Sequence, residues 1–517
     1  MRITPRRGIG VAAATAALVI PLATAAPAAA DPGLAALART VTVRGVENHL
    51  RHLQRIADAG HGTRAAGTPG YTASRDYVAG VLRKAGYTVT LQEFPRFFTT
   101  ELSTAVLQRV SPDPRTFTPT PPRGGSLGEF ATMAYSGSGD VTAPLRAVDL
   151  VLPPGPAPNT STSGCEAADF AGFTAGDLAL VQRGTCNYRV KALNAQAAGA
   201  RGVIIFNEGQ PGRTGTERSS LLGVGVDIPV VTASFAAGEE LARAAAPTVR
   251  LRTDVVRDYG SYNVIAESRF GDPDKVVQFG AHLDGVDAGP GVNDNGSGSA
   301  AVLEVAARLG RIPTRNRLRF SFWGAEEYGL VGSQHYVANL SAEEKARIRL
   351  YLNFDMVGSP NYALKIYDGD DSDATGGPAG PPGSDEIEKL FEKYFDTLGQ
   401  GHVGTDLDAR SDHDSFAQAG IPVGGLFTGA EELKTPAEQA LFGGTAGVPY
   451  DSCYHEACDD IDNVNGEALA LNTGAIATAA LVYGFARDLP GPDTRPVTVA
   501  RTLAPAAHDD HAGAPAR

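Results

Sequence analysis

The sequence has few cysteines and no pair with the C-x-x-C spacing that many zinc fingers use. Basic residues are not in excess either, because 45 Lys and Arg stand against 58 Asp and Glu and give a net charge of −13. An acidic chain is repelled by nucleic-acid phosphates and by anionic membrane surfaces, so we exclude both as partners. No 20–50-residue repeat is evident, and no apolar run after residue 30 has the length needed to span a bilayer.

Residues 1–30 have the composition of a secretory signal peptide. Three arginines among the first seven residues precede a mostly apolar stretch, and Ala28, Ala29 and Ala30 provide a small-residue cleavage site. Removal of this segment takes away three positive charges and no negative ones, so the net charge moves from −13 to −16. We expect a secreted, extracellular monomer with no membrane attachment after cleavage.

The four cysteines fit the oxidising compartment to which such a signal leads. Four cysteines allow three pairings. We favour the two that join neighbours in sequence, Cys165 with Cys186 and Cys453 with Cys458, and four unpaired thiols are the alternative.

Helix-like and strand-like patterns alternate from residue 40 to about residue 489. Apolar residues recur at helical spacing within 40–86, residues 87–94 alternate as a strand, and the Pro- and Gly-rich segment 111–128 is expected to be a loop. Residues 490–517 show no periodicity and are expected to form a disordered tail.

Residues 142–253 look like a separate unit of short strands. The expected strands are 147–152, 178–182, 202–206 and 228–232, with a helix over 188–198. The unit resembles a protease-associated (PA) domain in Cys165, Cys186 and the runs 177–184, 197–200 and 202–207. Because it carries no catalytic constellation, we expect it to act as a lid or substrate-access domain over a cleft.

Ligand-type residues follow apolar runs in the C-terminal α/β region. The run 276–281 precedes His282 and Asp284, and a Gly-rich turn then leads to Asp294 and to a helix expected over 297–309. The remaining candidates follow two further strand-like runs or lie between two cysteines; they are Glu326, Glu327, Asp355 and His455. Each has an ordinary structural explanation by itself, but open α/β sheets build their sites at the carboxyl ends of strands. Together these residues predict one site.

Two histidines and three carboxylates suit two adjacent divalent ions such as zinc. One carboxylate can bridge the ions, and each ion then keeps a histidine, a terminal carboxylate and an open position for water. Consecutive glutamates point in different directions, so one of Glu326 and Glu327 can bind metal while the other acts as a general base.

In several specific motifs the chain resembles the M28 family of zinc-dependent exopeptidases, and most closely the secreted bacterial aminopeptidases of that family. The resemblance spans about residues 43–486 and includes the inserted PA-like unit. Its motifs are His282-Leu283-Asp284, Asp294-Asn295, Gly324-Ala325-Glu326-Glu327, Asn353-Phe354-Asp355-Met356, Arg410-Ser411-Asp412-His413, Gly424-Gly425-Leu426-Phe427-Thr428-Gly429 and Cys453-Tyr454-His455.

The resemblance implies a set of metal ligands for two zinc ions per chain. His282 and Asp355 would hold one zinc, Glu327 and His455 would hold the other, and Asp294 would bridge them.

The resemblance also implies roles for residues around the metals. Glu326 would be the general base, and Tyr454 would donate a hydrogen bond to the developing oxyanion. Asp284 would orient the neighbouring histidine, while Arg410 and Phe427 would line the substrate cleft. His413 lies in a motif but matches no ligand.

We therefore expect an α/β fold of the zinc-exopeptidase (phosphorylase/hydrolase-like) kind. Its sheet should be mixed and mostly parallel, with helices on both faces and the small β-rich PA domain inserted. The expected divisions are a signal peptide (1–30), the N-terminal part of the peptidase domain (31–130), the PA-like domain (131–256), the main part of the peptidase domain with the metal site (257–489) and the tail (490–517).

The expected function is that of a secreted di-zinc aminopeptidase that removes N-terminal residues from peptides through a metal-bridging hydroxide and a glutamate base. The resemblance implies a preference for large apolar N-terminal residues. A carboxypeptidase or a glutaminyl-cyclase-like acyltransferase is the alternative on the same scaffold. A substrate carboxylate would need a basic clamp, for which Arg410 is the one candidate, and cyclase-like members work with one zinc. A metal-free receptor would require missing ligands, and none is missing.

Overall fold

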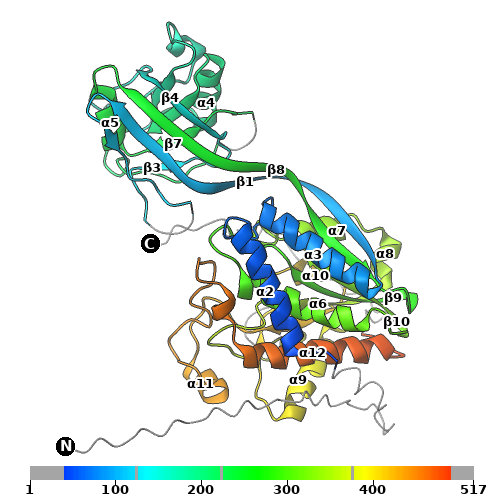
Figure 1. Cartoon of the computed structure of the whole chain (residues 1–517). Helices are drawn as coiled ribbons and strands as arrows, with labels where there is room; N and C mark the ends of the chain where they lie inside the picture. The colour runs from blue at the N-terminus through cyan, green and yellow to red at the C-terminus, as the bar shows by residue number, and fades with distance from the viewer. Residues whose placement is uncertain (1–39, 123–125, 222–224, 374–377, 491–517) are drawn as a thin grey trace, which may run out of the picture.

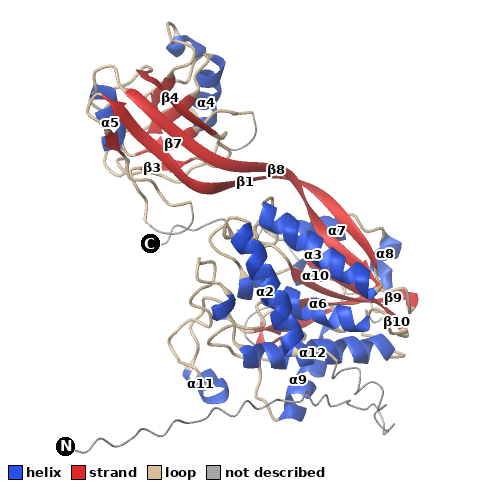
Figure 2. Ribbon diagram, viewed as in Figure 1, coloured by secondary structure: helices blue, strands red, loops and turns tan. Residues whose placement is uncertain are grey.

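The computed structural model describes residues 40–122, 126–221, 225–373 and 378–490. The expected signal peptide and all of the expected tail beyond residue 490 lie outside these residues. The described chain forms two lobes joined by a long ribbon of two strands (Figure 1). The ribbon pairs β1 (Thr88–Ser111) antiparallel with β8 (Thr248–Glu267), with four register shifts along its length. Figure 2 shows these two strands running from one lobe to the other.

The larger lobe is built on a mixed sheet in the order β13-β12-β14-β11-β9-β10-β8. Strands β14, β11, β9 and β10 run parallel, and β8 and β12 are antiparallel to their neighbours β10 and β14. The strands that have not yet been bounded are β9 (Asp272–His282), β10 (Asn316–Trp323), β11 (Ile348–Phe354), β12 (Lys365–Tyr367), β13 (Val403–Thr405) and β14 (Val423–Phe427). The mixed, mostly parallel α/β fold predicted from the sequence is confirmed.

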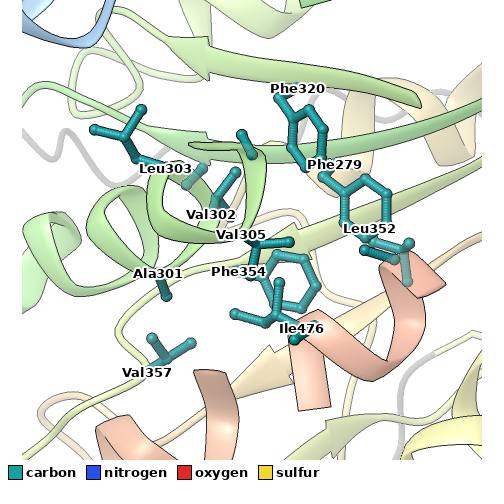
Figure 3. Close-up of a cluster of buried hydrophobic side chains, with 14 of the residues drawn as sticks. Phe279, Ala301, Val302, Leu303, Val305, Phe320, Leu352, Phe354, Val357 and Ile476 are labelled. Carbon is teal, nitrogen blue, oxygen red and sulfur yellow. The ribbon is translucent and has the colours of Figure 1, made fainter. Parts of the chain in front are cut away.

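One face of this sheet shares a core with five helices. They are α2 (Val43–Ala59), α3 (Pro69–Ala85), α6 (Gly298–Leu309), α9 (Ser384–Leu398) and α12 (Gly466–Phe485). Alternation along the strands turns Phe279, Phe320 and Leu352 toward these helices. The rings of Phe279 and Phe320 stack with centroids 5.2 Å apart (Figure 3).

The opposite face carries a second, aromatic core. It packs against α7 (Val331–Ala338) and α10 (His413–Gln418), with α8 (Ala342–Arg347) beside β9 and β11. Trp323 and Tyr351 point to this side, and Phe416 of α10 stacks on Tyr351 at a centroid distance of 3.8 Å. The remaining short elements of the lobe are η2 (Val292–Ser297), α11 (Pro436–Phe442) and η3 (Ile461–Asn463).

The smaller lobe is a second sheet in the order β4-β5-β6-β7-β3, attached to β8 through β4. Its elements are β3 (Phe130–Thr132), β4 (Gly139–Ala147), β5 (Leu178–Gln182), β6 (Gly202–Phe206), β7 (Val230–Ala233), η1 (Ala167–Phe170), α4 (Tyr188–Ala197) and α5 (Phe235–Arg243); β2 (Arg115–Thr116) pairs with β1. The predicted strands 178–182 and 202–206 are confirmed. The predicted strand 147–152 is wrong, because the strand ends at Ala147 and Asp149 has a φ of 44°, which a strand cannot adopt.

Helix α12 corrects one further expectation. Among the described residues it is long and apolar enough to cross a membrane, although the sequence had suggested no such run. However, 78% of the relevant window is buried inside the protein, and its side chains belong to the core that also contains α6. The all-round apolar composition is that of a core helix.

Candidate metal centre

A pocket with an empty volume of about 570 Å³ opens where the parallel strands of the larger lobe end. His282 is the last residue of β9, Asp355 directly follows β11, and Glu326 and Glu327 lie three and four residues beyond β10. All four line the pocket, together with Asp294 and His455. The structure therefore brings together every residue that the sequence predicted as a metal ligand or base.

Asp294 lies between the two histidines. Its Oδ1 is 3.3 Å from His282 Nε2, and its Oδ2 is 3.1 Å from His455 Nε2. Each histidine also faces a second carboxylate: His282 Nε2 is 3.2 Å from Asp355 Oδ1, and His455 Nε2 is 3.0 Å from Glu327 Oε2. This is the arrangement expected of two adjacent metal sites that share one carboxylate.

Burial makes the negative charge of this cluster expensive to keep. Burial, followed by the neighbouring charge of Asp294, raises the pKa of Glu327 to about 7. Burial likewise raises the pKa of Glu326 well above its ordinary value. Burial lowers the pKa of His455, but Glu327 and Asp294 outweigh it and raise that pKa to about 11. A positive charge bound among these carboxylates would therefore stabilise the cluster.

The residues fit zinc on two further observations. Histidine nitrogen and carboxylate oxygen are among the usual donors for zinc in proteins. Two overlapping groups have donor atoms within 4.8 Å of one another, His282 with Asp294 and Glu327, and His282 with Glu326 and Asp355. Glu327 Oε1 is also buried without a hydrogen-bond partner in the described part of the chain, and such an atom is costly unless a cation or water satisfies it.

The loop after β9 is fastened to the end of β11 by Asn295. Its amide nitrogen donates to the carbonyl of Phe354 at 2.9 Å, and its Oδ1 accepts from the backbone of Met356 at 3.2 Å. Helix α6 begins against the same carbonyl, since a Cβ on Gly298 would lie 2.1 Å from Phe354 O. The backbones that carry Asp294 and Asp355 are thereby held together.

Asp284 was expected to orient His282, but its carboxylate makes a different contact. Its carboxylate Oδ1 lies 3.8 Å from His282 Nδ1, which is longer than a hydrogen bond, and accepts instead from the backbone of Glu326 at 3.1 Å. His282 Nδ1 lies instead 3.2 Å from the main-chain carbonyl oxygen of Asp284. The carboxylate thus fixes the segment that carries Glu326.

The outer part of the pocket contains the other predicted site residues. Phe427 and Arg410 line it, and Tyr454 stacks on the ring of His455 at 3.8 Å. The Arg410 guanidinium pairs with Glu431 and Glu432 at 2.9 and 3.0 Å, and it lies 3.4 Å from the Tyr454 hydroxyl. None of the described residues within 131–256 lines the pocket, and the lid or substrate-access role expected for the PA-like unit stays a prediction.

Several supporting residues were missed from the sequence. Ser411 donates to Asp355 Oδ2 at 2.7 Å and accepts from Asn353 at 2.8 Å. Asp459 accepts from the backbone of Asp294 at 3.0 Å. Ser411 could have been found from its motif, and Asp459 from its place directly after Cys458. His413, left out of the ligand set, contacts the carbonyl of Asp408 and the ring of Tyr367.

Both predicted disulfides are present. Cys165 is joined to Cys186 in the smaller lobe, and Cys453 is joined to Cys458. The second bond closes a short loop around Tyr454 and His455. It constrains the one histidine of the site that does not lie at a strand end.

Comparison with known proteins gives a consistent result. The sequence profile described as "Peptidase family M28" matches residues 263–480, and that described as "PA domain" matches residues 141–241. The chain is 50% identical over 448 residues to the "Aminopeptidase" of Pseudomonas aeruginosa (strain UCBPP-PA14), which covers 85% of this chain and 81% of that one. It is 41% identical over 488 residues to the "Probable lipoprotein aminopeptidase LpqL" of Mycobacterium tuberculosis, covering 92% and 91%. The solved structure of BSAP, a zinc aminopeptidase from Bacillus subtilis, is similar with a TM-score of 0.50 and 26% identity, covering 85% and 94%.

The Cys453–Cys458 bond gives a first prediction. Replacing both cysteines with serine should weaken zinc binding by about tenfold or more, because the loop around His455 gains freedom that binding must remove. The zinc Kd is measured by competition with a chromogenic chelator. The matched control replaces Cys165 and Cys186, which lie in the other lobe, and should leave the zinc Kd unchanged. Equal zinc affinities of the two double variants would contradict the role given to the loop.

Proposed function

The chain belongs to peptidase family M28 and is a metalloaminopeptidase, and from this premise we propose that it binds two zinc ions at the candidate metal centre and releases N-terminal residues from peptides. The observation that carries the proposal is the position of Asp294, whose two oxygens face two different histidines. His282 and Asp355 would hold one ion, and Glu327 and His455 would hold the other. Bound there, zinc supplies Lewis acidity toward a peptide carbonyl oxygen and toward water.

Glu326 is the group that moves the proton. It lines the pocket beside the proposed ligands, yet its nearest carboxylate oxygen is 3.9 Å from His282 Nε2, further than that of Asp355. In our proposal it takes a proton from the attacking water and passes it to the departing amine nitrogen. The Tyr454 hydroxyl donates a hydrogen bond to the carbonyl oxygen as negative charge develops on it.

The substrate is held at its free N-terminus. A protonated α-amine fits among the pocket carboxylates, of which Glu326 and Asp355 are the candidates. Met356, Phe427 and Ala430 offer apolar surface for the first side chain, which supports a preference for large apolar residues. Asp406 and Asp408 line the same pocket and disfavour an acidic side chain by charge repulsion.

A carboxypeptidase is less well supported. It would need a free basic group to bind the substrate carboxylate, and Arg410 is already paired with Glu431 and Glu432.

Secretion is proposed from the expected signal peptide, with which the two disulfides agree. A monomer free of membrane attachment is proposed as well.

The test of this function compares leucine p-nitroanilide with N-acetyl-leucine p-nitroanilide and glutamate p-nitroanilide. Leucine p-nitroanilide, whose amine is free, should release p-nitroaniline. This release should be lost when the metal is chelated and should return when zinc is added back. The acetylated substrate should not be cleaved, because it lacks the positive amine, and the glutamate substrate should have a kcat/KM at least about tenfold lower. Equal cleavage of the leucine substrate and its acetylated form would rule out recognition of the free N-terminus.

The role of Glu326 gives a separate prediction. Glu326→Gln keeps the side-chain shape but cannot accept the proton, so kcat should fall by about 10²- to 10⁴-fold. Zinc content, measured by atomic absorption, should stay at the wild-type level because Glu326 is not a proposed ligand. Glu343→Gln on α8, where the side chain is 78% exposed, is the matched control. A kcat near wild type in Glu326→Gln would remove Glu326 from the mechanism.

A further inference from the structure

The segment 283–294 connects β9 to the turn that carries Asp294, and most of it lies outside regular secondary structure. Two consecutive residues, Thr63 and Arg64, lie against it from the turn between α2 and α3. Both are fully buried. Their side chains donate hydrogen bonds to four carbonyl oxygens of the segment, those of Leu283, Val286, Pro290 and Gly291.

Arg64 makes three of these four bonds. Its Nε donates to Pro290 O at 2.9 Å, and its two terminal nitrogens donate to the carbonyls of Leu283 and Gly291. The planar guanidinium therefore joins both ends of the bend, the end that follows His282 and the end that precedes Asp294. A lysine could not reproduce this fork, because its donors radiate from one nitrogen.

Asp459 holds the other end of the segment through amide groups. Its two carboxylate oxygens accept from the backbone nitrogens of Asn293 and Asp294 at 2.8 and 3.0 Å, and its own carbonyl accepts from Val292 at 3.1 Å. Asp459 directly follows Cys458, the residue that closes the disulfide loop that carries His455. It thus connects the backbone of Asp294 to that of His455.

The two groups act on opposite poles of the same backbone. The guanidinium of Arg64 takes up carbonyl oxygens and the carboxyl group of Asp459 takes up amide hydrogens, and the three bonds that Arg64 donates are charge-assisted. Burial lowers the pKa of Arg64, and the neighbouring charges of Asp459, Asp284 and Asp294 act against that lowering. Neither Arg64 nor Asp459 lines the pocket, so both act through the backbone they hold.

We propose that Arg64 and Asp459 form a buried clamp on segment 283–294 that positions Asp294 between the two histidines and thereby sets the zinc affinity of the centre. They are positioning residues, and Thr63 adds one further bond to the clamp. The inference rests on the proposed zinc site. It goes beyond that site because it assigns the affinity to residues that contact neither metal nor substrate.

The experiment measures the zinc Kd of the metal-free full chain by competition with a chromogenic chelator. Arg64→Lys keeps the charge and loses the fork, and Asp459→Asn keeps the shape and loses one acceptor. Each should weaken zinc binding by about 10- to 100-fold, the usual effect of removing a group that supports metal ligands. Thr63→Val removes the hydrogen bond to Val286, together with the one that the Thr63 hydroxyl accepts from the backbone of Ala65, and should weaken binding by about fivefold.

Matched controls lie near the clamp residues in the sequence but outside the clamp. Arg51→Lys on α2 changes an arginine whose side chain is 54% exposed, and Asp462→Asn changes an exposed carboxylate three residues beyond Asp459. Both should bind zinc as the wild type does. Fluorescence of Trp323, the one tryptophan of the chain, reports unfolding of the larger lobe in each metal-free variant.

Three results would decide the question. Weaker zinc binding by variants whose metal-free form still unfolds cooperatively supports the clamp, and if Arg64→Lys does not fold, Thr63→Val and Asp459→Asn carry the same test. Wild-type zinc affinity in folded Thr63→Val and Asp459→Asn overturns the clamp while leaving the zinc site intact. A wild-type chain that binds no zinc overturns the proposed function itself, and the clamp with it.

Discussion

The candidate metal centre depends on four carboxylates and two histidines that lie together in one largely buried pocket. Asp294, Glu326, Glu327 and Asp355 are each at most 9% exposed, and ionised carboxylates at such depth are unfavourable unless positive charge compensates them. The neighbouring carboxylates raise the pKa of both histidines against the effect of burial, so protonation of the histidines is one source of such charge. Under the proposed function divalent cations provide more. Burial makes unpaired carboxylates unfavourable, and it thereby favours the binding of a metal cation at this site.

Three kinds of support hold the pocket residues at their positions. His282 and Asp355 are fixed by strands β9 and β11, whose apolar side chains fill the cores on both faces of the sheet. His455 is fixed by the disulfide loop. Asp294 has neither support. Its backbone nitrogen donates to Asp459, and the side chain of the next residue, Asn295, donates to the carbonyl of Phe354. That contrast is why the clamp is proposed for this part of the site and not for the others.

The sequence predicted what is local and left out what depends on distant contacts. Strands 178–182 and 202–206 were found from uninterrupted apolar runs. Most ligand-type residues were found because they follow such a run, whereas Asp294 follows a Gly-rich turn and His455 lies between cysteines. The full length of β1 and β8 was not predicted, because a ribbon between two lobes does not bury a continuous apolar face and its pairing joins residues far apart in sequence. Arg64 gave no signal, since an arginine in a turn-rich stretch is ordinarily solvated, and its partners lie more than 200 residues away.

Diffraction of the zinc-loaded protein on both sides of the zinc absorption edge tests most directly whether one bridging carboxylate organises two zinc ions. We predict two anomalous peaks in the pocket, one beside His282 and Asp355 and the other beside Glu327 and His455, with Asp294 in contact with both. A single peak would contradict it, as would a second zinc bound away from Asp294, for example at Asp368 and Glu388, which form a separate acidic group with Asp370.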